Sequence, residues 1–157
     1  MKRMAIITAG CLLALCMAAC IQSGVAALVT TLGNASSGIA ALEGNSTLAA
    51  TLQTDTAAVS TAVLNWKQGS PTQNVIQALN LVEADLDLIP STDKYAPLVD
   101  LAIGTVESIM EIVQPNSTAV QARAGITHRV YLKSPPKSAG QFKKEWNSLA
   151  PAEAKIQ

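Results

Sequence analysis

Residues 70–90 read SPTQNVIQALNLVEADLDLIP and contain the clearest helical pattern in the chain. Ser70 is a favourable N-cap residue, and Pro71 suits the first helical position, where its missing N–H group costs nothing. Pro90 ends the run. The apolar residues between these positions recur at helical intervals and predict one buried stripe on an amphipathic helix: Val75, Leu79, Val82, Leu86 and Ile89.

The segment after Pro90 carries a second helical pattern. This helix is expected to begin near Thr92 or Asp93. It accepts Pro97 within its first turn and ends before Pro115. Together with the first helix it predicts an antiparallel hairpin across a short turn. Its stripe consists of Leu98, Leu101, Thr105, Ile109 and Ile112.

A third helix is expected upstream, between a break and cap at Gly44-Asn45-Ser46 and an end at Gly69. Its outer face is rich in Ser and Thr, and Asp55 is almost its only charge. Threonine has restricted rotamers in a helix, so tertiary packing has to stabilise this segment. Its apolar stripe is Leu48, Leu52, Val59, Val63 and Trp66.

Residues 22–43 are also in helical phase, but Gly33 and Gly38 interrupt them. Each glycine costs about 1 kcal/mol relative to alanine in a helix interior. The pattern therefore predicts a broken or bent helix. The alternative is a flexible tether that lifts the domain off a membrane.

These segments predict an all-α fold: a three- to four-helix up-and-down bundle with a C-terminal extension that carries a short amphipathic helix. In an alternative arrangement, only the hairpin of residues 70–114 is firmly folded. The heptad-like stripes also permit an oligomer. The expected divisions are a signal peptide at 1–19, a tether or broken helix at 20–45, a bundle core at 46–114 and a basic tail at 115–157.

The start of the chain has the layout of a secretory signal peptide. Lys2 and Arg3 form a basic head, and an apolar stretch runs from Met4 to Ala19. This stretch is shorter than the roughly 20 apolar residues that a membrane span needs, and polar residues follow it. Cleavage is therefore expected.

The three cysteines of the chain all lie near this stretch. Cleavage before Cys20 removes Cys11 and Cys16 and leaves one thiol, which cannot form an internal disulfide. Cys16 follows Leu15, which is too large for the last position before a cut, and Cys11 would leave too short an apolar region. Of the three cysteines, only Cys20 fits a cut directly before it.

The sequence Met17-Ala18-Ala19-Cys20 resembles the lipobox of bacterial lipoproteins, which has an aliphatic residue, two small residues and an obligatory cysteine. Met17 stands where leucine is usual. The resemblance covers the first 20 residues and implies nothing about the fold. It implies that the signal is cut before Cys20 and that the thiol carries palmitate-type acyl chains, which hold a protein stably on a bilayer when two or more are present.

The same resemblance bears on location. Ile21 stands where an aspartate often retains such proteins in the inner membrane, so the outer membrane is implied in a two-membrane cell envelope. Otherwise the protein would face the periplasm from the inner membrane. The alternative is an ordinary signal peptide that is cut after Ala19 or near Ser23.

Charge divides the mature chain into an acidic body and a basic tail. Residues 20–120 carry two bases and nine acids, whereas residues 121–157 carry seven bases and two acids. After Pro135-Pro136, Ser138 can cap a short helix. One side of that helix presents Phe142, Trp146 and Leu149, and Lys143 and Lys144 lie off this stripe.

Two interpretations of this helix remain open. In the first, Phe142 and Trp146 dock on the bundle and cover its end. In the second, these residues, with Lys143 and Lys144, contact anionic lipid, the cell wall or an envelope protein partner. Nucleic acid is not expected as a partner of an exported protein.

No catalytic constellation is present in the sequence. His128 is the only histidine, which excludes a multi-histidine metal site within one chain. Glu83 and Asp87 share a helical face while Asp85 points elsewhere, a pattern typical of a solvated surface. No glycine-rich phosphate loop and no nucleophile elbow appear. We therefore expect no enzyme activity, metal or cofactor.

The sequence thus favours a membrane-tethered exported lipoprotein that serves as a non-catalytic envelope scaffold or interaction module. The alternative is a carrier that encloses a small apolar ligand in an internal pocket of the bundle.

Overall fold

The computed structural model describes residues 2–66, 71–90, 94–114 and 135–157, with side chains from residue 21 onward. Within these residues every regular element is helical, which confirms the all-α fold class. The elements are α1 (Lys2–Leu42), α2 (Ser46–Asn65), α3 (Gln73–Asp87), α4 (Ala96–Val113), α6 (Ala139–Leu149) and the short 3₁₀ helix η1 (Ala152–Ala154).

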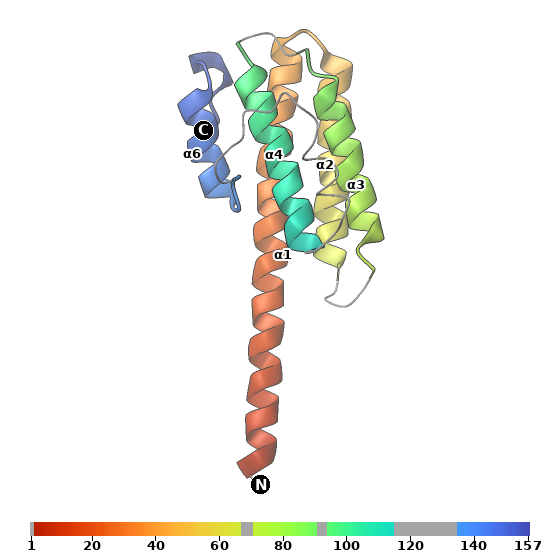
Figure 1. Ribbon diagram of the computed structural model, residues 1–157, viewed down its shortest axis with the longest axis vertical. Helices are drawn as coiled ribbons and strands as arrows, with labels where there is room; N and C mark the ends of the chain where they lie inside the picture. Colours follow the sequence, from red (N-terminus) through yellow and green to blue (C-terminus); the bar gives the residue numbers. More distant parts are fainter. Residues whose placement is uncertain (1, 67–70, 91–93, 115–134) are drawn as a thin grey trace.

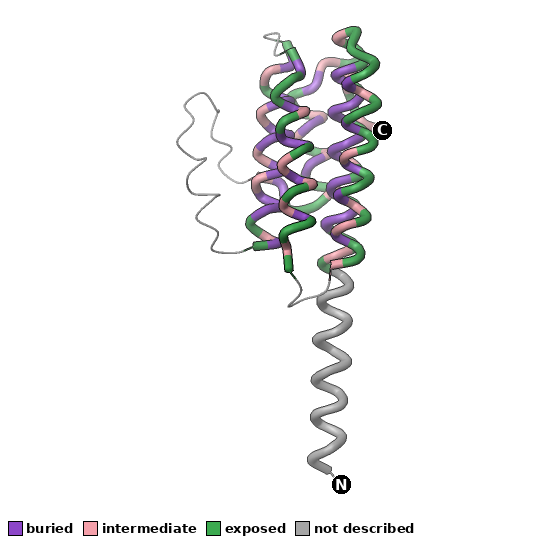
Figure 2. The backbone as a smooth tube through the Cα atoms, turned by 90° about the vertical axis from the view of Figure 1, so that its right-hand side faces the viewer, coloured by how far each residue is buried: buried purple, intermediate pink, exposed green. Residues whose placement is uncertain are grey.

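Helices α1, α2, α3 and α4 lie side by side, and each runs opposite in direction to the one before it (Figure 1). The N-terminal part of α1 extends well past the other helices. Helix α6 lies along the outside of this group, in contact with α1 and α4. Buried residues line the inner faces of the helices along the length of the group (Figure 2). The name "the bundle" denotes α1 from residue 21, together with α2, α3 and α4.

The expected break within residues 22–43 does not occur, because α1 continues without interruption to Leu42. Its side chains Leu28, Leu32 and Ile39 are almost completely buried and belong to the core. Residues 20–45 are therefore not a tether, and the core begins well before residue 46. Burial of this helical face outweighs the local cost of its glycines.

Gly33 has a packing role that the sequence does not reveal. A Cβ atom at this position would lie 2.1 Å from the hydroxyl oxygen of Thr56 in α2. The absence of a side chain thus allows α1 and α2 to approach closely. Gly38 has no atom within 4 Å of the corresponding position and plays no such role.

The predicted turn between α1 and α2 is confirmed. Gly44 has φ +80°, a left-handed conformation that glycine adopts without steric cost. Its N–H group donates to the carbonyl of Ala41, and that of Asn45 donates to the carbonyl of Ala40, which together close the end of α1. The Asn45 side chain then caps α2 by accepting from the N–H of Leu48 at 3.0 Å.

The apolar stripes predicted for α3 and α4 are buried, apart from a half-buried Ile112. The predicted start of α3 is wrong, because the helix begins at Gln73 with Thr72 as its N-cap. Pro71 is exposed and precedes the helix, and Ser70 lies outside the described residues. The first buried residue is Val75, so an earlier helical turn would have no core contact to stabilise it.

Candidate functional site

Cys20, the predicted lipid attachment site, lies within α1, and its side chain is outside the described part of the structure. The helix before it is the part that extends past α2, α3 and α4 (Figure 1). The first buried side chain after it is Val25, and Ile21 is 52% exposed. Cys20 therefore lies where α1 enters the bundle.

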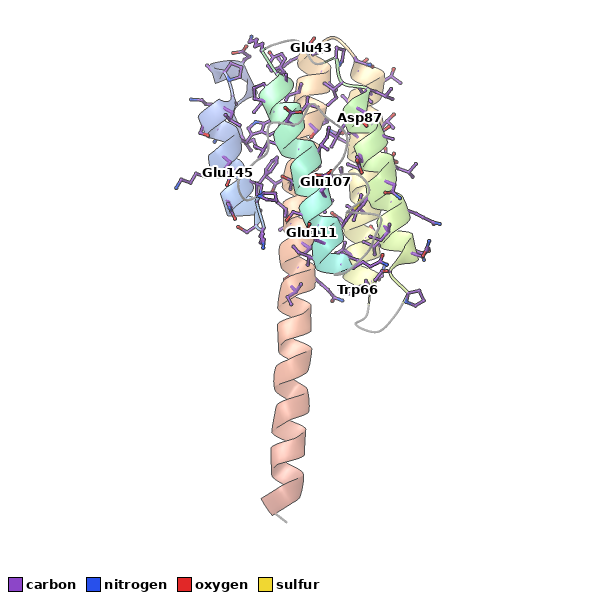
Figure 3. The ribbon with its side chains drawn as sticks, viewed as in Figure 1. Glu43, Trp66, Asp87, Glu107, Glu111 and Glu145 are labelled. Carbon is purple, nitrogen blue, oxygen red and sulfur yellow. The ribbon has the colours of Figure 1, made fainter. Side chains whose placement is uncertain are left out.

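A hydrogen bond joins this part of α1 to the end of α2. The side-chain amide of Gln22 donates to the main-chain carbonyl of Trp66, the C-cap residue of α2. Trp66 is half-buried, and its buried Nε1 has no hydrogen-bond acceptor within the described structure. Figure 3 shows Trp66 at the end of the bundle from which α1 extends, with Glu43 at the opposite end.

A pocket of about 380 Å³ lies at the same end, between the last turn of α2 and the first turn of α3. Its lining includes two asparagines, Asn65 and Asn74, beside apolar residues. It differs from the internal, aliphatic cavity that an apolar-ligand carrier would require. Its lining residues are Ala62, Asn65, Trp66, Pro71, Asn74 and Val75.

The aromatic residues of the C-terminal helix are packed inside the molecule. Phe142 and Trp146 have no exposed area, and their ring centroids are 5.4 Å apart. Trp146 Nε1 donates to the carbonyl of Ala154 at 2.8 Å. A fully buried side chain cannot reach a partner while α6 is docked, so a contact role for Phe142 and Trp146 stays a prediction that requires α6 to leave the bundle. The docked alternative is the arrangement in this structure.

The chain after α6 folds back along that helix. The Asn147 side chain donates to the carbonyl of Ile156 at 2.9 Å and accepts from its N–H at 2.8 Å. Ser138 caps the start of the helix, as predicted, by accepting from the N–H of Gln141. The tail thus holds α6 at both ends.

The charged side chains in the described part of the tail are more exposed than the aromatic side chains there. Lys144 is exposed and Lys143 half-buried, so a role for them in partner or membrane contact remains a prediction. An ion pair between tail and body joins Glu153 of the tail to Lys94 of the acidic body. This contact lowers the pKa of Glu153 and raises that of Lys94. In this pair the acid comes from the basic tail and the base from the acidic body, which is the reverse of the net charges of the two segments.

The acidic residues of α3 do not form one solvated face. Glu83 is buried, at 8% exposure, while Asp87 is exposed. Asp85 is half-buried beside Asp55 of α2. Desolvation, and then the neighbouring Asp55 carboxyl group, raise the pKa of Asp85 to about 6. A buried Oδ2 of Asp85 lacks a hydrogen-bond partner among the described residues.

Sequence reasoning missed this carboxyl pair, although a signal was present. Asp55 is the only acid on a Ser- and Thr-rich helix, and Asp85 leaves the face shared by Glu83 and Asp87. The described residues contain no group of three or more side chains suited to a metal ion. His128 lies outside the described residues.

One helical segment, Ile21–Leu42, is long and apolar enough to cross a membrane, with a mean hydropathy of 1.4. About three fifths of it (61%) is buried inside the protein, as in the core helix of a soluble protein. An N-terminal apolar helix of this kind is also compatible with a signal or anchor. Comparison of the chain with protein-family models, curated proteins and solved structures found no match.

Proposed function

We propose that this chain is an exported lipoprotein, anchored to a membrane of the bacterial envelope by acyl chains on Cys20. Its folded part is an up-and-down bundle of four helices with a C-terminal extension. The bundle serves as a non-catalytic scaffold or interaction module. In a cell with two membranes the proposed location is the outer membrane, because Ile21 replaces the aspartate typical of inner-membrane retention.

The observation that carries this proposal is the place of Cys20 in α1. A cut before Cys20 removes the part of the helix that extends past the others (Figure 1). The core begins at Val25, so the cut leaves every buried side chain of the described bundle in place. A cut more than one turn later would begin to remove core residues such as Leu28, each of which contributes about 1.5–3 kcal/mol.

The sequence supports the same boundary. A basic head, an apolar stretch and two small residues precede the only cysteine that fits a lipobox. Two or more acyl chains provide stable membrane attachment, since each buried methylene contributes about 0.8 kcal/mol.

Metabolic labelling with a palmitate analogue tests the proposal. Wild-type protein and a Cys16→Ala variant should both take up the label, whereas Cys20→Ala should not. The Cys16→Ala variant is the matched control, because it removes a cysteine from the same apolar stretch and retains the proposed attachment site. Label that persists in Cys20→Ala, or that is absent from wild type, contradicts the proposal.

A further inference from the structure

We propose that the end of the bundle that carries Trp66 rests on the lipid bilayer, with Trp66 in contact with phospholipid of the anchoring membrane. This inference rests on the proposed lipid anchor at Cys20. It adds an orientation and a contact surface: the helices stand on the membrane, and the turn at Gly44 faces away from it.

The path between the anchor and Trp66 is short. Gln22 donates a hydrogen bond to the carbonyl of Trp66. Helical rise places Cys20 only about 3 Å further along the axis of α1 than Gln22. An acylated Cys20 therefore brings the bilayer surface within about one helical turn of Trp66.

No long spacer separates the anchor from the bundle. Only residues 21–24 separate Cys20 from Val25, the first buried residue of the bundle. Even if these residues were fully extended they would span no more than about 14 Å. The bundle therefore cannot move far from the surface to which its first residue is attached.

The side chain of Trp66 also suits a membrane interface. Trp66 is half-buried, so part of its ring is accessible from outside, whereas its Nε1 is buried. Tryptophan is enriched at membrane interfaces, where its large ring suits the boundary between the apolar region and the headgroups. The accessible part of the Trp66 ring is therefore the part that contacts phospholipid.

The residues around Trp66 also suit contact with phospholipid. The pocket beside Trp66 is lined by Asn65 and Asn74 together with apolar residues, which suits the boundary between headgroup and acyl chain. Two large apolar side chains near the same end of α1 and α2 are exposed, Ile21 at 52% and Leu64 at 57%. Contact with lipid would remove both from water.

The described residues give no electrostatic basis for this contact. Glu111 is exposed and lies at the same end of the bundle as Trp66 (Figure 3). Its carboxylate would be repelled by anionic headgroups. Binding through the ring of Trp66 and the exposed apolar groups is therefore expected in zwitterionic bilayers, and it should persist when salt is raised.

Tryptophan fluorescence tests the inference, because the chain contains only Trp66 and Trp146. Protein purified from bacterial envelopes is reconstituted into phosphatidylcholine vesicles with or without bromine on the acyl chains near the headgroup. Wild type should lose the Trp66 share of its emission to bromine. The Trp66→Phe variant retains the fully buried Trp146 and should lose little. A Trp146→Phe variant, which reports Trp66 alone, should lose most of its emission.

Equal quenching of wild type and Trp66→Phe, or no quenching of either, overturns the inference. Mass spectrometry of the N-terminal peptide from the same sample reports the anchor separately. A peptide without acyl chains overturns the proposed function and this inference with it. An acylated Cys20 together with an unquenched Trp66 overturns the inference alone.

Discussion

Gly33→Ala provides the sharpest test of how α1 and α2 pack. A Cβ atom at residue 33 would lie 2.1 Å from the hydroxyl oxygen of Thr56, 2.7 Å from its Cβ and 3.0 Å from its Cγ2. Thr56 is 3% exposed, and its hydroxyl donates to the carbonyl of Leu52 at 2.6 Å. The Thr56 side chain therefore has little room to move, and one of the helices has to shift.

The expected cost follows from two opposing effects. Replacing glycine with alanine in a helix interior stabilises it by about 1 kcal/mol. Overpacking a well-packed interface costs about 1–3 kcal/mol, and displacing the buried Thr56 hydroxyl from its acceptor costs about 1–3 kcal/mol more. Together these effects predict that Gly33→Ala lowers the free energy of unfolding by about 1–5 kcal/mol.

Gly38→Ala is the matched control, because it makes the same change in the same helix. No atom lies within 4 Å of a Cβ at Gly38, so only the helix propensity changes and stability should rise by about 1 kcal/mol. Urea unfolding followed by far-ultraviolet circular dichroism measures both variants. A combined Gly33→Ala and Thr56→Ala variant should recover part of the loss, since the nearest contact is removed. Equal stability of the two glycine variants would refute the reasoning.

Two further predictions concern the carboxyl pair and the tail. Because the pKa of Asp85 is raised to about 6 beside Asp55, the stability it contributes is present below its unfolded-state pKa of about 4 and is lost as pH rises through about 6. Asp85→Asn should flatten this decline of stability with pH and add about 1 kcal/mol to the free energy of unfolding at neutral pH, after allowance for solvent screening. If the stability of variant and wild type, measured by urea unfolding, changes in parallel with pH across this range, the prediction is contradicted. Trp146→Ala should cost about 3–5 kcal/mol and make residues 135–157 sensitive to protease, whereas the exposed Lys144→Ala should have little effect. A Trp146→Ala protein as stable as wild type would show that α6 is not docked.

The helices with regular stripes could be predicted from the sequence. In α3 and α4, apolar side chains at every third or fourth position face the core, and Leu79, Leu86 and Leu98 are completely or almost completely buried as expected. The N-caps that a side chain makes could also be predicted from the sequence, at Asn45 and at Ser138. These features depend on neighbouring residues in the sequence, so a local pattern is sufficient to find them.

The candidate site was less predictable, because it depends on contacts between distant residues. The sequence placed Trp66 at the end of an apolar stripe, and only the folded chain brings it beside Gln22. The sequence left two roles open for Trp146, docking on the bundle or contact with a partner. The hydrogen bond from Trp146 to Ala154 forms in the docked arrangement. Neither contact follows from helical periodicity, which fixes the face of a helix and leaves its neighbour undetermined.

The unbroken course of α1 shows why a local rule for glycine fails here. Helix propensity counts each glycine as a loss of about 1 kcal/mol, but at Gly33 the space of the absent side chain is filled by Thr56. The polar character of α2 does not prevent this close packing. Thr56 donates to the carbonyl of Leu52 one turn earlier in its own helix, and Ser60 donates to the carbonyl of Ala26 across the interface. Their hydroxyl groups are thus satisfied at the α1–α2 contact, and a Ser- and Thr-rich helix can pack directly against a glycine-containing one.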